Sequence, residues 1–151
     1  MATEPTIAVL NGACEAQESR AATFLSTVSD YWALTKPEVN FLILITTFAG
    51  FYLASTNGPA SFHSLLALHT LLGTLLVAGG TAALNQALEY SFDRQMRRTA
   101  RRPVAAGRIP RSHAFIFGIS LALAGAAYLR IEVNGLACLL AITTLASYLF
   151  L

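Results

Sequence analysis

The sequence contains few charged residues. They make up only 12% of the 151 residues, against about 25% in soluble domains. The stretch from Val39 to Leu88 carries no charge at all, and apolar residues reach 55% of the chain. This balance excludes a disordered chain and an ordinary soluble domain, and it indicates a polytopic membrane protein.

Cysteine is also scarce. Cys14 and Cys138 lie far apart, and neither belongs to a CxxC pattern or a close Cys/His cluster. We therefore expect neither a disulfide framework nor a zinc site. Residues 1–30 lack the long apolar stretch of a signal peptide, and we interpret them as a flexible cytoplasmic tail.

Long apolar runs dominate the remainder of the chain. Four of them approach the roughly 20 residues that a transmembrane helix needs: residues 39–56, 65–84, 113–129 and 133–151. Their apolar character does not alternate, so helices are predicted and barrel strands are not. The expected fold class is all-α, a polytopic transmembrane helix bundle. Because the chain ends within the fourth run, we expect it to be part of a longer protein.

The third run also carries a pattern of small residues. Gly118, Ala122 and Ala126 repeat every four positions. Small side chains at this spacing allow another helix to approach closely. We interpret the pattern as helix packing.

Basic residues are concentrated in one window. Seven of the ten lie between Arg94 and Arg111. We predict a loop at residues 94–112, because an arginine near the bilayer centre costs about 2.5–3.5 kcal/mol. By the positive-inside rule this loop is cytoplasmic. Both termini then lie in the cytoplasm, and the turns at 57–64 and 130–132 face the other side.

Three polar residues lie where the second run meets this loop. Asn85, Glu89 and Asp93 are spaced at i, i+4 and i+8, so one helix would present all three on the same face. Two carboxylates and a carboxamide are hard oxygen ligands, which suit Mg²⁺. Such a site gains its remaining ligands from water and from substrate phosphates. The spacing therefore predicts a magnesium–diphosphate site at the membrane boundary.

The arginines beside this motif are the natural partners of phosphate oxygens. They are Arg94, Arg97, Arg98, Arg101 and Arg102. A diphosphate with an apolar tail would place its head here and its tail between the helices. Surface salt bridges and a simple topology signal are the alternatives. The flanking spans argue against nucleic acid as a partner.

The same residues resemble a known family. The run Asn85, Glu89, Asp93, Met96, Arg98, Thr99, Arg102, Pro103, Ala106, Gly107 and Arg108 is similar to the first acidic motif of the UbiA superfamily of intramembrane prenyltransferases. The element Leu34, Thr35, Lys36 and Pro37 before the first run is similar to the protohaem IX farnesyltransferase (haem O synthase) branch. The resemblance covers residues 31–151.

The resemblance implies a fold and a reaction. The family fold has nine transmembrane helices, of which this chain would supply about four, the N-terminal half. The reaction transfers a farnesyl group from farnesyl diphosphate to a vinyl group of haem b, which yields haem O. Asn85, Glu89 and Asp93 would be catalytic and would hold Mg²⁺. Arg98, Arg102 and Lys36 would bind the diphosphate.

The resemblance also implies a setting. The protein would lie in the bacterial inner membrane as a multi-pass protein with a cytoplasmic N-terminus. Besides the lipid bilayer and its two substrates, its candidate partners are a haem A synthase or terminal oxidase assembly factors.

Three departures from the family pattern leave alternatives open. Glu89 and Ser91 occupy positions where the family usually has acidic residues, aspartate in the first case. No second Asp-rich motif exists in the sequence, so we expect the chain to be inactive alone. The alternatives are a UbiA relative acting on a quinone or chlorophyll precursor, and a non-catalytic four-span membrane protein.

Overall fold

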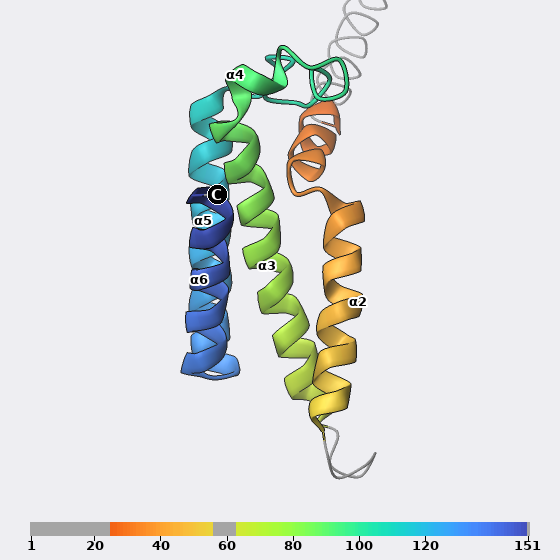
Figure 1. The fold of residues 1–151 in the computed structure, drawn as a ribbon, viewed down its shortest axis with the longest axis vertical. Helices are drawn as coiled ribbons and strands as arrows, with labels where there is room; N and C mark the ends of the chain where they lie inside the picture. Colours follow the sequence, from red (N-terminus) through yellow and green to blue (C-terminus); the bar gives the residue numbers. More distant parts are fainter. Residues whose placement is uncertain (1–24, 56–62, 151) are drawn as a thin grey trace, which may run out of the picture.

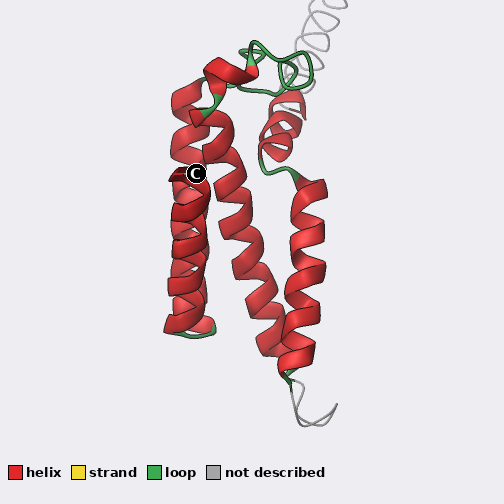
Figure 2. Ribbon diagram, viewed as in Figure 1, coloured by secondary structure: helices red, strands yellow, loops and turns green. Residues whose placement is uncertain are grey.

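The described part of the chain is entirely helical. The computed structural model describes residues 25–55 and 63–150, and these ranges contain no strand (Figure 2). Residues 25–34 are helical. The remaining helices are α2 (Pro37–Ala54), α3 (Ser64–Leu88), α4 (Tyr90–Asp93), α5 (Arg111–Glu132) and α6 (Gly135–Phe150). The expected all-α membrane bundle is confirmed.

The four long helices run along one axis (Figure 1). Helices α2, α3 and α5 are long and apolar enough to cross a membrane, whereas α6 has 16 residues and is shorter. Residues 94–110 connect α4 to α5 at one end, which we call the basic end. The predicted loop boundary at 112 is wrong by two residues, because Arg111 and Ser112 already belong to α5.

Helices α3 and α5 pack so closely that glycine is required between them. A Cβ atom at Gly80 would lie 2.6 Å from the backbone nitrogen of Ala122 and 2.7 Å from the carbonyl oxygen of Gly118. Gly118, Ala122 and Ala126 are buried. The predicted close approach along the third run is therefore confirmed, and its partner is α3.

A small apolar cluster organises the basic end. It joins residues from the helix before α2, from α3, from the connecting segment and from α5: Leu34, Ala83, Ala87, Val104, Ile109 and Ala114. Val104 and Ile109 insert from the connecting segment and are almost fully buried. Their burial fixes that segment against the helix ends, so the arginines beside them have defined positions.

The expected tail at residues 1–30 needs a correction at its end. Residues 25–30 are helical. The Nε atom of Arg108 donates to both carboxylate oxygens of Asp30, at 2.8 and 3.0 Å. These residues belong to the folded part, and the rest of the predicted tail lies outside the described residues.

Candidate functional site

The acidic motif lies where α3 ends at the basic end. The sequence predicts one continuous helix face, but α3 ends at Leu88 and α4 begins at Tyr90, with Glu89 between them at φ −79° and ψ 3°. The spacing nevertheless survives. The amide of Glu89 donates to the Asn85 carbonyl oxygen and the amide of Asp93 to that of Glu89, each at 2.9 Å. The break therefore bends the motif without changing its helical register.

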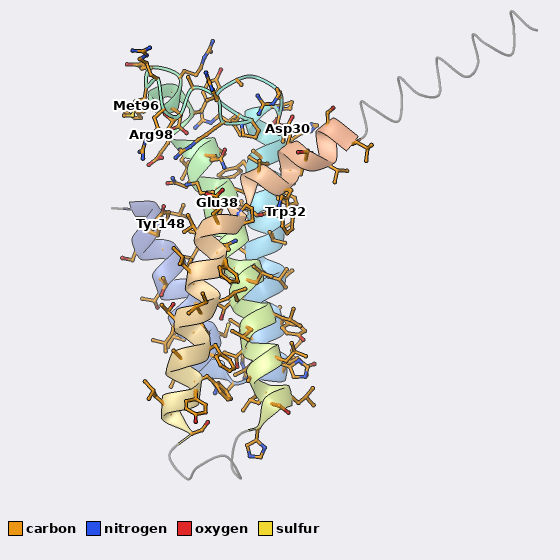
Figure 3. The ribbon with its side chains drawn as sticks, turned by 90° about the vertical axis from the view of Figure 1, so that its right-hand side faces the viewer. Asp30, Trp32, Glu38, Met96, Arg98 and Tyr148 are labelled. Carbon is orange, nitrogen blue, oxygen red and sulfur yellow. The ribbon has the colours of Figure 1, made fainter. Side chains whose placement is uncertain are left out.

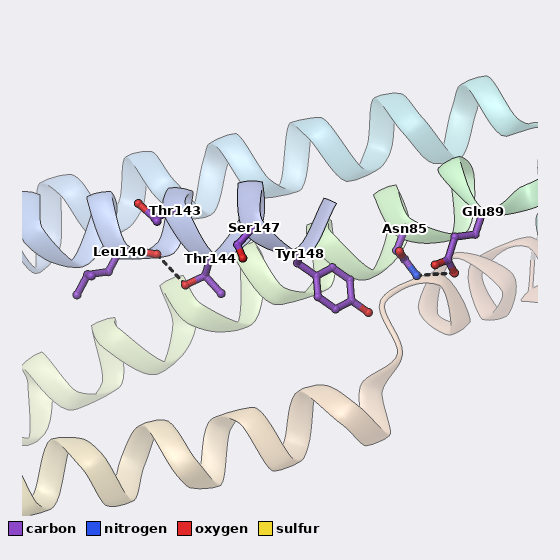
Figure 4. Close-up of a pocket in the computed structure, with 7 residues that line it drawn as sticks. All are labelled: Asn85, Glu89, Leu140, Thr143, Thr144, Ser147 and Tyr148. Carbon is purple, nitrogen blue, oxygen red and sulfur yellow. Dashed lines mark hydrogen bonds between the residues drawn. The ribbon is translucent and has the colours of Figure 1, made fainter. Parts of the chain in front are cut away.

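The two ends of the motif have different surroundings. The Nδ2 atom of Asn85 donates to Oε2 of Glu89 at 2.9 Å (Figure 4), and about half of the Glu89 side chain is exposed. The Asp93 side chain is buried, and the hydroxyl of Thr99 donates to its backbone carbonyl oxygen at 3.0 Å. Asn85 and Glu89 therefore face open space, whereas Asp93 lies against the connecting segment.

Arg102 joins the two carboxylates. Its Nη1 atom lies 2.7 and 2.9 Å from the carboxylate oxygens of Asp93 and 3.8 Å from Oε2 of Glu89. Among the described residues, Nη1 makes all the side-chain contacts that Arg102 has with acceptors. Its Nε and Nη2 atoms remain available for further oxygen atoms.

Lys36 lies beside Arg102. Both residues line a hollow of about 460 Å³ that opens between the start of α2 and the connecting segment. Burial lowers the pKa of Lys36 below its ordinary value of 10.5, and the positive charges of Arg102 and Arg98 act in the same direction. Glu89 and Asp93 act in the opposite direction. The predicted diphosphate residues and the two carboxylates therefore lie within electrostatic reach of one another.

Arg98 is one of the two exposed residues among the predicted site residues, the other being Glu89. It lies on the connecting segment at the basic end, near Met96 (Figure 3). Its side chain makes no hydrogen bond or salt bridge that involves the described residues, apart from its electrostatic effect on Lys36. In the described part of the chain, Arg98 therefore has no ion pair that it would have to break in order to bind a phosphate group.

A hollow of about 600 Å³ lies between the acidic motif and α6. Its walls are Asn85 on α3, Glu89 just after α3 and, on α6, Leu140, Thr143, Thr144, Ser147 and Tyr148 (Figure 4). The sequence analysis missed this hydroxyl-bearing face. Its signal was a polar stripe at helical spacing on an otherwise apolar helix, with Thr143 and Ser147 four residues apart.

The oxygen donors of the acidic motif are of the chemical kind that Mg²⁺ prefers. Asn85, Glu89 and Asp93 offer oxygen atoms, and a single cationic atom, Nη1 of Arg102, already contacts both carboxylates. The described ranges contain no group of three or more His, Cys, Asp or Glu residues that could enclose a metal ion. An incomplete oxygen set is what Mg²⁺ uses when substrate phosphates supply the other ligands.

Comparison with known proteins identifies the family of this chain. The model of the UbiA prenyltransferase family matches residues 43–151. The chain belongs to this family. The match begins inside α2 and includes the whole acidic motif, the basic connecting segment, α5 and α6.

Several proteins that are similar to this chain share one name. The protoheme IX farnesyltransferase of Solibacter usitatus is 42% identical over 128 residues, which is 81% of this chain and 44% of that protein. Those of Mycolicibacterium smegmatis and Koribacter versatilis are 41% and 37% identical, and cover 85% and 82% of this chain. The chain spans about two fifths of the length of these relatives. No solved structure matches it.

Proposed function

We propose that this UbiA-family chain forms the N-terminal part of a protohaem IX farnesyltransferase that converts haem b to haem O in a bacterial inner membrane. The observation that carries the proposal is that Arg102 contacts both Glu89 and Asp93, and that Glu89 lines a hollow between the end of α3 and α6. Carboxylates for a metal and cations for a diphosphate then share one site. The names of the relatives supply the acceptor, haem b.

The residues at the basic end account for the first step. The allylic C–O bond of farnesyl diphosphate breaks, and the diphosphate leaves with the bonding electrons. Mg²⁺, when bound by Asn85, Glu89 and Asp93, would supply positive charge where this negative charge develops. Arg98, Lys36 and the available nitrogens of Arg102 would bind the phosphate oxygens that the metal does not reach.

The second step joins carbon to carbon. A vinyl carbon of haem b would form a bond to the farnesyl carbon, and water would add to the resulting cation and lose a proton. The apolar helices beside Glu89 would exclude water until the acceptor has reacted. We propose that this chain supplies only part of that enclosure and of the metal site, and that it is inactive without the remaining spans.

The proposal is tested with a chimera. The part of the Solibacter usitatus relative that follows its matched region is fused to this chain, and the membranes are supplied with farnesyl diphosphate, Mg²⁺ and haem b. We expect haem O, identified by mass, from the chimera and none from the chain alone. Haem O from the chain alone would overturn the proposed division, and transfer only to a quinone precursor would overturn the proposed acceptor.

A substitution in the chimera tests the acidic motif. Asp93→Asn keeps the size of the side chain but removes a carboxylate from the proposed metal site, and we expect turnover to fall at least about a hundredfold. Glu132→Gln is the matched control, because Glu132 lies at the opposite end of α5. Equal turnover of the two variants would exclude Asp93 from the mechanism.

A further inference from the structure

The turn before α2 contains a residue, Lys36, in an unfavourable left-handed backbone conformation. Lys36 has φ 49° and ψ 65°, and it is the one non-glycine residue with positive φ in the described ranges. A side chain in this left-handed region is strained unless the surrounding structure holds it there. Neighbouring groups must therefore fix the Leu34–Pro37 turn.

Two buried carboxamides hold this turn. The Nε2 atom of Gln86 donates to the carbonyl oxygen of Leu34 at 3.1 Å, and the Nδ2 atom of Asn40 donates to the carbonyl oxygen of Thr35 at 2.8 Å. Gln86 and Asn40 are only 1% and 3% exposed. They come from different helices, α3 and α2, so the turn is attached to both.

Gln86 is not the residue that stability alone would select. Its Oε1 atom is buried without a hydrogen-bond partner in the described part of the chain. A buried acceptor without a donor costs free energy, whereas leucine would fill the same space at no such cost. In the described part of the chain, the one hydrogen bond of the Gln86 side chain is the bond to the turn.

The turn is directly connected to the candidate site. Gln86 follows Asn85 of the acidic motif in α3. On the other side, the turn carries Lys36 into the hollow that it shares with Arg102. A change in the turn therefore changes the distance between the Lys36 amine and the cluster of Arg102, Glu89 and Asp93.

We propose that Gln86 and Asn40 are positioning residues. They hold the Leu34–Pro37 turn so that the Lys36 amine lies beside Arg102 and faces an incoming diphosphate. The identity of the bound group rests on the proposed function. The holding of the turn does not, because it follows from the two hydrogen bonds and the backbone conformation of Lys36.

Lys36 can be observed directly, because it is the only lysine in the chain. The full chain in detergent is acetylated with limiting acetic anhydride at a series of pH values, and the labelled fraction of the Lys36 peptide is measured by mass. The N-terminal amine is the internal reference. In the unmodified chain we expect the labelling midpoint below 10.5, since burial lowers the pKa of Lys36.

The variants Gln86→Leu and Asn40→Leu release the turn. We expect the labelling midpoint to rise toward 10.5 in both, and a rise of half a pKa unit lowers the labelling rate at neutral pH about threefold. Asn134→Leu is the matched control. It removes the hydrogen bond that the backbone amide of Ala137 donates to Oδ1 of Asn134, next to the turn between α5 and α6. Its labelling profile should equal that of the unmodified chain.

A second substitution covers the case in which Gln86→Leu does not fold. Gln86→Met keeps the length of the side chain and removes the donor, and it should shift the midpoint in the same direction. An unchanged midpoint in folded Gln86 and Asn40 variants would overturn the positioning role. A shifted midpoint in a chain whose chimera does not transfer farnesyl would overturn the proposed function and leave the positioning role intact.

Discussion

Arg102 determines how the charges of the site are arranged. It contacts Asp93 with two hydrogen bonds, and the Asp93 side chain is only 5% exposed. A buried carboxylate that loses its partner keeps its desolvation cost and loses the compensating attraction. The pair therefore matters more to stability than the exposed arginines of the same segment, whose ion pairs contribute little.

Removal of Arg102 should destabilise the fold. We expect Arg102→Gln to lower the free energy of unfolding by about 3 kcal/mol, measured by detergent-induced unfolding followed by circular dichroism. Arg101→Gln is the matched control, because Arg101 is exposed and its side chain forms no salt bridge with the described residues. Equal losses from the two substitutions would contradict the role given to the Asp93 contact.

Lys36 should make stability depend on pH. Its pKa is lowered in the folded state, so the unfolded chain binds the proton more strongly and stability rises with pH between the lowered value and 10.5. The contribution is complete above 10.5 and is lost as pH falls through the folded pKa. The difference in melting temperature between the chain and Lys36→Gln should therefore change across this interval. A constant difference would show that the folded and unfolded pKa values are equal.

The sequence predicts a set of candidate site residues but not how their side chains are paired. The spacing of Asn85, Glu89 and Asp93 and the arginines after them are local patterns. The contact between Arg102 and Asp93 depends on the path of the connecting segment, which is held after Arg102 by the burial of Val104 and Ile109. The bond from Gln86 to Leu34 joins residues 52 positions apart, and no local pattern indicates it.

At the scale of elements, the apolar runs predict the helices well, and the error lies at their ends. The second apolar run ends at residue 84 and the helix was expected to continue through the acidic motif to Asp93, but α3 ends at Leu88. The interruption at Glu89 has no signal in the sequence. The small residues of the third run predicted that another helix approaches closely. They did not indicate that this helix is α3.

This packing gives a matched pair of glycine substitutions. A methyl group at Gly80 would meet the backbone of α5 at less than 3 Å, whereas one at Gly50 in α2 would meet nothing within 4 Å. We expect Gly80→Ala to destabilise the chain by about 1–3 kcal/mol through overpacking. Gly50→Ala should stabilise it by about 0.5–1 kcal/mol, because the unfolded chain has less conformational freedom with alanine than with glycine and therefore loses less entropy on folding. Detergent-induced unfolding of both variants measures the contrast, and similar values would contradict the close contact.

At the scale of the whole molecule, the two ends are chemically different. The basic end carries the connecting segment, the acidic motif and Lys36. At the far end, Nδ1 of His69 lies 2.6 Å from the Tyr128 hydroxyl, which joins the start of α3 to the end of α5. Each end thus has its own contacts between α3 and α5. In the described ranges, every arginine except Arg130 lies at the basic end. This asymmetry is what orients a bundle in a membrane.

The orientation can be tested with single cysteines. In a chain with Cys14 and Cys138 replaced by serine, we introduce Arg101→Cys at the basic end or Asn134→Cys in the turn between α5 and α6. The positive-inside rule predicts that the basic end lies in the cytoplasm, so we expect a membrane-impermeant maleimide added to intact spheroplasts to label Asn134→Cys at once. It should label Arg101→Cys only after the membrane is opened. The reverse pattern would place the basic end and the candidate site outside the cytoplasm and would contradict the predicted orientation.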